Sequence, residues 1–443
     1  MSARCVFRAT RLRRIDLQGV ALKSLRLLAW VGAFGVMTVL ATVPRLWAQS
    51  STTETAAEKV SVPAGTKLYV RLVTPVSTKT SHLRDAVTTR VVREVPAPTG
   101  VVVPLGAQVL GTVQQLVPSS NPTDRARILL RFTRLEIPDR PAVPLAARLV
   151  EVENSRETVQ DDGAIRGVLA SELPLSHLEG AVGKLAKSTG KVGAGVQSAQ
   201  VKMLGKTDAS ITYPEGADLV LVLDQPLELE ASFPSSVSAQ LSPGVSEPIQ
   251  QLLVDAPQRV ASRDGKPGDP VNLVFTGTID EIRQAFKDAG WSEAARKTGV
   301  SVYRIVRAMG GDQGYEAAPV SNLYLYGRTQ DLAFEKMLNT FAKRHHLRLW
   351  RSPVKTAEGR EIWVGAATHD TGMDIRPGVV SHAIDPDLDD ERAKVGADLV
   401  ATGRVSATQL VTRPDPVSEG KTATGATWKT DGQLLVIELK PAS

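Results

Sequence analysis

Runs of alternating apolar residues place the strongest restriction on how this chain folds. In the segment "GTKLYVRLVT", Leu68, Val70 and Leu72 alternate with Lys, Tyr and Arg. This period of two is typical of a strand that buries one face. Similar runs continue to residue 152, and Pro, Gly and Asn separate them at short intervals. The pattern predicts a small antiparallel β barrel or sandwich.

The same β-type pattern returns after residue 211. "PAGTKLYVRLVTPV" begins at Pro63 and "PEGADLVLVLDQPL" begins at Pro214, and both fit P-x-G-x-x-L-x-[VL]-x-L-x-x-P. A true duplication and two independent but similar turns both explain so short a motif. We predict one β-rich module over residues 60–231, interrupted at 156–211. The interruption mixes glycine with lysine, which favours a flexible or surface-lying hairpin over a membrane span.

The N-terminal 48 residues carry eight basic side chains and one acid, and they contain seventeen consecutive uncharged residues at 27–43. A basic lead followed by an apolar run and "RLWAQS" is typical of an export signal, with cleavage after Ala48. Seventeen residues also approach the shortest membrane-spanning helix, so a retained anchor is the alternative. In both cases we expect the rest of the chain in the periplasm, either released or anchored to the membrane and facing that compartment.

The remaining chain is close to neutral, with 45 basic and 46 acidic residues, although the whole chain has a net charge of +6. Nucleic-acid binding requires a concentrated excess of basic residues, so it is not expected. The single cysteine, Cys5, precedes the apolar run. The exported part therefore has no disulfide, thiolate zinc site or cysteine nucleophile.

A different pattern begins after a Ser-, Pro- and Gly-rich stretch at 232–267, which we interpret as a linker. A buried strand at 271–275 leads into a helix that Thr278 and Glu281 cap and Gly290 ends. The stretches "SVYRIVRAMGG" and "DLAFEKMLNTFAKR" are predicted to be helical as well. Residues 268–443 are therefore expected to form an α+β domain.

Four of the six histidines, His345, His346, His369 and His382, fall between residues 345 and 382. "HHLRLWRSPVKTAEGREIWVGAATHD" predicts two paired strands joined by a turn, with His346 and His369 both at the end away from that turn. Alternation places His346, Arg348 and the following tryptophan on one face. This concentration of histidine is the best local indication of a site.

The acidic stretch "HAIDPDLDDER" at 382–392 has a purely structural explanation. Asp385 caps a helix, Pro386 takes its first position, and the further acids favour its positive end. An EF-hand calcium loop is excluded, because Asp390 stands where the loop needs glycine and Gly396 where it needs glutamate. The predicted helix ends at Gly403, and its buried stripe comprises Leu388, Val395 and Leu399.

Several longer motifs carry a family resemblance. "GDPVNLVF", "AGW", "APVSNLYLYGRTQDLAFEK", "RHHLRLW", "IWVGAATHD" and "HAIDPDLDDER" occur in the order found in the LssY-like C-terminal domain, over residues 268–405. That bacterial domain is named for a secretion component, has no established activity, and also occurs beside phosphatidic-acid-phosphatase-like regions. The β module resembles accessory domains of exported proteins and the barrel of conjugation-type secretion channel proteins, which implies a structural or interaction role.

Two hypotheses for the function follow. In the favoured one, the chain is a non-catalytic envelope component that assists assembly or secretion and binds a protein partner. In the other, it is an extracytoplasmic hydrolase of phosphoesterase type, with histidines and carboxylates for acid–base work or metal binding and arginines for an anion. The candidate metal ligands for a divalent ion are His346, His369 and His382. The candidate catalytic residues are Arg328, His346, Arg348, His369, Asp370, His382, Asp385 and Arg392.

Overall fold

The computed structural model describes residues 59–98, 100–119, 123–169, 172, 209–230, 232–294, 321–340, 342–376 and 379–442. Residues Ala56–Ser443 form one compact unit. The predicted export segment, most of the glycine-rich interruption and the predicted helix at 301–311 lie outside the described residues. No helix in the described part of the chain is long and apolar enough to span a membrane.

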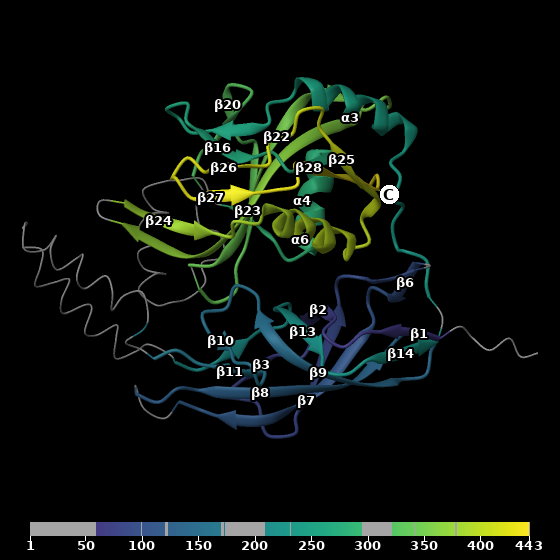
Figure 1. Ribbon diagram of the computed structural model, residues 1–443, viewed down its shortest axis with the longest axis vertical. Coiled ribbons are helices and arrows are strands. Elements are labelled where there is room, and N and C mark those ends of the chain that lie inside the picture. The colour runs from purple at the N-terminus through teal and green to yellow at the C-terminus, as the bar shows by residue number, and fades with distance from the viewer. Residues whose placement is uncertain are drawn as a thin grey trace, which may run out of the picture. The chain divides into compact units, whose positions relative to one another are not determined.

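The N-terminal region contains a closed barrel of six antiparallel strands (Figure 1). The order around it is β8, β7, β4, β2, β13 and β9, and the β8–β9 pairing closes the ring. Each strand turns its apolar residues inward, as the alternation predicts; Leu68, Ile128 and Leu221 are fully buried. The strands are β2 (Lys67–Leu72), β4 (Ala86–Val91), β7 (Gln108–Val117), β8 (Arg127–Glu136), β9 (Val143–Val152) and β13 (Asp218–Leu223).

Short strand pairs surround this barrel. β1 pairs with β14, β3 with β12, β5 with β6, and β10 with β11, which extends the sheet from β8. Their bounds are β1 (Lys59–Val62), β3 (Val76–Ser77), β5 (Val95–Ala97), β6 (Gly100–Val103), β10 (Thr158–Val159), β11 (Ala164–Arg166), β12 (Thr212–Tyr213) and β14 (Leu227–Glu230).

The two copies of the repeated motif lie next to each other in the barrel, because β2 and β13 are antiparallel neighbours. The backbone N–H of Gly65 donates to the Leu223 carbonyl at 2.8 Å, and that of Gly216 donates to the Leu72 carbonyl at 2.9 Å. Both glycines have a positive φ, 85° and 90°, which explains why each turn needs glycine. The two turns thus make equivalent hydrogen bonds, each to the end of the other copy's strand, in a locally twofold arrangement.

The C-terminal region is built on a second sheet, in the order β18, β21, β22, β23, β17, β28 and β25, with β24 added to β23. Its pairs are antiparallel except the parallel β17–β28 pair. The strands are β17 (Leu273–Thr276), β18 (Ser292–Glu293), β21 (Leu332–Lys336), β22 (Arg344–Lys355), β23 (Glu361–Arg376), β24 (Val379–Ile384), β25 (Val405–Thr412) and β28 (Gln433–Leu439).

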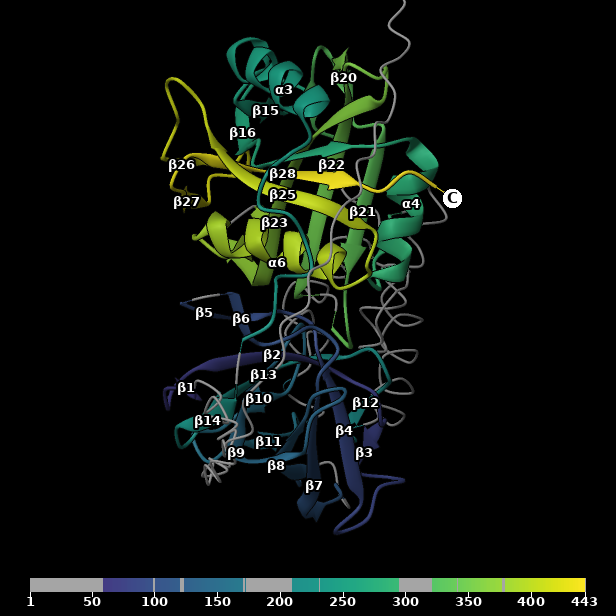
Figure 2. The same cartoon turned by 90° about the vertical axis from the view of Figure 1, so that its right-hand side faces the viewer.

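Helices cover both faces of this sheet, so the region is α+β as predicted. Helices α4 (Ile279–Asp288) and α6 (Leu388–Val400) pack with Phe275 and Leu347 on one face, and α6 lies beside β23 (Figure 2). Helix α3 (Pro243–Asp255) packs with Trp350 on the other face. Smaller strands accompany them: β15 (Arg259–Ala261), β16 (Pro267–Pro270), β19 (Tyr324–Leu325), β20 (Arg328–Thr329), β26 (Glu419–Lys421) and β27 (Thr427–Lys429).

Local signals were accurate for α4, where Thr278 and Glu281 form both bonds of the predicted capping box. The linker prediction is wrong for α3 and for strands β15 and β16. Pro243 occupies the first turn of α3, a position where proline favours a helix, and the helix buries Ile249 against the sheet.

The helix predicted over "DLAFEKMLNTFAKR" is also wrong, because residues 332–336 form strand β21. All five residues of this strand are buried, so its sequence does not show the alternation of apolar and polar residues that marks a strand with one exposed face. Glu335 and Lys336 interrupt the apolar residues of this segment. In the structure they are buried and ion-paired, which only tertiary contacts reveal.

Candidate functional site

The register of β22 and β23 separates the predicted histidines onto two faces of the sheet. His345 lies opposite His369, and His346 lies opposite Thr368. Successive residues of a strand point to opposite faces. His346 and Arg348 therefore lie on the α3 face, whereas His345 and His369 lie on the face covered by α4 and α6. The structure does not bring His369 together with the other two predicted metal ligands.

On the α3 face, the carboxylate of Asp370 contacts three basic side chains. His346 Nε2 lies 3.0 Å from Asp370 Oδ1, Arg344 Nε donates to Oδ2 at 3.1 Å, and His382 Nδ1 lies 3.4 Å from Oδ2. Burial alone raises the pKa of Asp370, but His346, His382 and Arg344 outweigh it and hold the pKa below its usual range. We call Asp370 and these three partners the Asp370 cluster.

Arg348 completes this arrangement by fixing the His346 ring. Its Nη1 donates to His346 Nδ1 at 3.2 Å, and its Nε donates to the Ser321 carbonyl at 3.0 Å. A nitrogen that accepts from a guanidinium carries no proton, so Nε2 is the nitrogen that donates to Asp370. The predicted residues His346, Arg348, Asp370 and His382 thus lie together, with their hydrogen-bonding capacity largely used within the cluster.

The remaining predicted residues lie elsewhere and have structural partners. Arg392 makes two bonds to Asp431, at 2.6 and 2.8 Å. Arg328 pairs with Asp331 and also donates to the Arg351 carbonyl at 2.7 Å.

Asp385 is not the helix cap that the sequence predicts. It accepts the N–H of Asp387 at 2.9 Å, and Asp387 is the N-cap of α6. The predicted buried stripe of that helix, Leu388, Val395 and Leu399, is confirmed, since all three residues are fully buried.

The α4/α6 face carries a second group of charges, at the junction between the barrel and the C-terminal sheet. Lys394 Nζ lies 2.9 Å from both Asp218 and Asp398, and Lys336 Nζ lies 2.5 and 2.9 Å from the same two carboxylates. Arg71 Nε donates to Asp218 at 2.7 Å, and its Nη2 donates to Asp398 at 3.2 Å. Asp218 and Arg71 belong to the barrel, so this ion network joins the two regions.

Asp218 and Lys394 stay ionised at neutral pH although they are buried. Burial raises the pKa of Asp218, but Lys336, Lys394 and Arg71 outweigh it and lower that pKa well below the usual value. Burial likewise lowers the pKa of Lys394, whereas Asp218 and Asp398 raise it well above its usual value. Each charge is thus stabilised by the others and not by water.

His345 supplies the last positive charge of the network. Burial lowers its pKa, but the Glu391 carboxylate, 2.6 Å from Nδ1, and Glu153, 3.7 Å from Nε2, raise it to about 9. The imidazole is therefore protonated at neutral pH. Four acids then balance four cations: Glu153, Asp218, Glu391 and Asp398 face Arg71, Lys336, Lys394 and His345.

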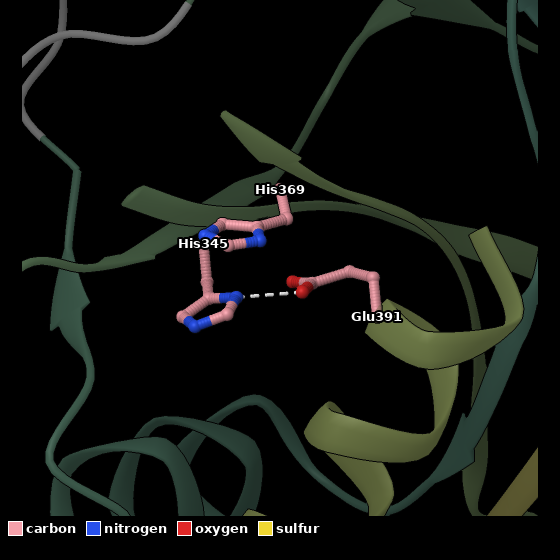
Figure 3. Close-up of side chains that lie close together, drawn as sticks. All are labelled: His345, His369 and Glu391. Carbon is pink, nitrogen blue, oxygen red and sulfur yellow. Dashed lines mark hydrogen bonds and ion pairs between the residues drawn. The ribbon is translucent and has the colours of Figure 1, made fainter. Parts of the chain in front are cut away.

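His369 stacks on His345 but remains neutral. The ring centroids are 4.2 Å apart with an interplanar angle of 21°, and the Glu391 carboxylate faces the edges of both rings (Figure 3). Burial, followed by the nearby charge of His345, lowers the pKa of His369 to about 4. Its Nε2 lies 3.0 Å from Oδ1 of Asn154, which belongs to the barrel side.

A cavity of about 310 Å³ opens beside His369. Its lining comes from both regions: Asn154 and Glu157 follow β9, whereas Lys343 and His369 belong to the C-terminal part. The half-buried His369 ring therefore has one side toward this cavity and the other toward buried His345.

Residues 253–434 match the family described as LssY C-terminus. This part of the chain is an LssY C-terminus domain. The resemblance predicted from the motifs is confirmed, and the matched segment starts earlier than residue 268. A solved structure of ComB10 of the Com type IV secretion system of Helicobacter pylori aligns at 12% identity over 38% of this chain and 88% of that one, with a TM-score of 0.21. A likeness this low carries no argument. A comparison with curated proteins gave no match.

The whole Asp370 cluster lies within the LssY domain, whereas the junction needs both regions. The LssY domain contributes His345, His369 and Glu391, together with Lys336, Lys394 and Asp398. One sequence feature could have indicated this second group of charges, at the junction. Glu391, Lys394 and Asp398 fall on the same side of α6 as its apolar stripe, and charges at such positions indicate a buried polar contact.

Proposed function

We propose that this chain is an exported, non-catalytic envelope protein in which the barrel and the LssY domain act as one structural or interaction unit. The observation that carries the proposal is the buried junction, where charges from the barrel neutralise charges from the LssY domain. Removing one partner from such a network leaves an uncompensated buried charge, so the two regions depend on each other. That dependence favours a fixed assembly unit over two independently moving domains.

The arrangement of the predicted catalytic residues supports the same proposal. A hydrolase that used His346, His369 and His382 together would need them in one cleft, yet His369 lies on the opposite face of the sheet from His346. His346 and His382 instead share Asp370 with Arg344. The Asp370 cluster therefore gives no support to the hydrolase alternative.

Residues 1–48 support the proposed location. A basic lead followed by seventeen uncharged residues fits export across the inner membrane, by a cleaved signal or a retained anchor. The folded part would then face the periplasm and meet envelope proteins there. The partner is proposed to be another envelope protein, since the folded part has almost no net charge to attract nucleic acid.

The test combines location, catalysis and assembly in one bacterial host. Full-length chain and a version lacking residues 1–48 are compared for protease access in intact cells and spheroplasts. We expect degradation of the full-length chain only after spheroplasting, and protection of the truncated chain throughout. In vivo crosslinking of the envelope fraction should then give a discrete larger complex.

The same purified chain is assayed with p-nitrophenyl phosphate, with and without added divalent metal. We expect no turnover above that of a matched His346→Ala/His382→Ala variant. Turnover in the wild type that disappears in this folded double variant would overturn the non-catalytic proposal. Protease protection of the full-length chain in spheroplasts would overturn the proposed location.

A further inference from the structure

We propose that His345, His369 and Glu391 form a binding site for a divalent transition-metal ion of the zinc class, at the junction of the barrel and the LssY domain. One nitrogen of each imidazole and one carboxylate oxygen of Glu391 all lie within 4.8 Å of one another. Two imidazoles and one carboxylate are a ligand set that zinc uses in sites with an open coordination position. Of the three histidines predicted from the sequence as metal ligands, this set contains only His369.

The hydrogen bonds of Asn154 fix the state of His369 that metal binding requires. Asn154 Nδ2 donates to the Lys336 carbonyl at 3.2 Å, so its Oδ1 is the atom that faces His369 Nε2 at 3.0 Å. An amide oxygen only accepts, and Nε2 must therefore carry the proton. The neutral ring then presents an unprotonated Nδ1. Histidine ligands in metal sites commonly donate their other N–H to such an outer partner.

A carboxylate oxygen without a hydrogen-bond partner supports this site. Glu391 Oε1 is buried and has no such partner, and Glu391 is only 3% exposed. His345 Nε2 lies beside Glu153, so Nδ1 is the His345 nitrogen at the Glu391 carboxylate, 2.6 Å from Oε2. A bound ion would take the place of the proton between His345 Nδ1 and Glu391.

The cavity beside His369 gives the proposed ion an entrance. It is large enough for water and a hydrated cation, with a volume of about 310 Å³. Its wall includes Asn154, Glu157 and His369. Water from this side would occupy the coordination positions that the three protein ligands leave open.

Zinc titration of the full chain, purified without a histidine tag and stripped with a chelator, tests this proposal. Binding is measured by competition with a chromophoric chelator, and Co²⁺ is used as a second probe for its visible absorption. We expect one Zn²⁺ per chain in the wild type. His369→Ala and Glu391→Gln should weaken binding at least about 100-fold, and Asn154→Gly about 10–100-fold, the range found for outer partners of ligands.

His346→Ala and His382→Ala are the matched controls, because each removes a histidine from the opposite face of the same sheet. Both should keep the zinc affinity within about threefold, and far-UV circular dichroism checks that every variant is folded. Absence of stoichiometric zinc from the wild type overturns the proposal, whatever the variants do. So does unchanged affinity in folded His369→Ala, or an equal loss in the His346→Ala control. His369 is half-buried, so its variant decides the matter even if Glu391→Gln does not fold.

Discussion

The two faces of the C-terminal sheet carry the same kinds of side chain, but these side chains have different roles. On the α3 face, Asp370 gathers His346, His382 and Arg344, and all of them come from the LssY domain. On the α4/α6 face, charges of the LssY domain meet charges of the barrel. Adjacent residues 345 and 346 supply one histidine to each face. A histidine-rich motif therefore does not by itself indicate a single site.

The carboxylates on the two faces hold different parts of the molecule together. The Asp370 cluster fixes strands of one domain to each other, so its loss should destabilise that domain. The junction network fixes two regions of the chain to each other, so its loss should also let those regions separate. Variants of one acid on each face can distinguish these two roles.

The largest effect is expected from Asp398→Ala, which leaves Lys336 and Lys394 with one fewer buried counter-charge and removes the acceptor of Trp291 Nε1. Breaking a buried ion pair costs about 3–5 kcal/mol. Urea unfolding followed by tryptophan fluorescence measures the loss, and limited proteolysis should cut between the barrel and the LssY domain. Arg328→Ala is the control: its pair with Asp331 is exposed, so a change below about 0.5 kcal/mol is expected. Equal effects of the two substitutions would mean that the junction contributes no special stability.

A somewhat smaller effect, about 3 kcal/mol, is expected from Asp370→Asn, because the amide keeps the shape and one acceptor oxygen but removes the charge between His346 and Arg344. Urea unfolding again gives the free energy. The distinguishing measurement is limited proteolysis below the unfolding transition. Asp370→Asn should leave the connection between barrel and LssY domain as resistant as in the wild type. If it opens that connection as Asp398→Ala does, the two faces are not independent.

The sequence was informative wherever a local pattern determined the structure. Strand alternation in the barrel, the Thr278 capping box and the pairing of β22 with β23 follow from neighbours in the chain. The junction could not be predicted in this way, because Asp218 and Lys394 are 176 residues apart. The single-site hypothesis failed for a related reason. His346 and His369 are both near one strand end, but an offset of one residue in the pairing puts them on opposite faces.

Acid should weaken the junction in a defined pH window. Burial raises the pKa of Asp398, yet Lys336 and Lys394 outweigh it, and the folded pKa of both Asp398 and Asp218 lies below the usual value. A carboxylate with a lowered folded pKa contributes stability that is present above its unfolded pKa, about 3.9, and lost as pH falls toward the folded pKa. The contribution of each of these two aspartates to the free energy of unfolding should fall by on the order of 1 kcal/mol by pH 3. Unfolding free energies from pH 6 to pH 3 should fall less steeply in Asp398→Asn than in the wild type, and parallel curves would contradict this origin.

The smallest effect is expected from Asn154→Gly, which tests how much one neutral side chain contributes to the same junction. Asn154 has φ 55°, a conformation that glycine adopts without strain, so the backbone should be kept. The substitution removes the bonds to the Lys336 carbonyl and to His369, which together should cost about 1–2 kcal/mol in urea unfolding. Asp139→Gly is a matched control, since Asp139 is an exposed residue with φ 59° and lies away from the junction. Because glycine at such positions also changes the unfolded chain, only the difference between the two variants reports the contribution of the side chain. A difference near zero would assign the joining of barrel and LssY domain to the charged residues alone.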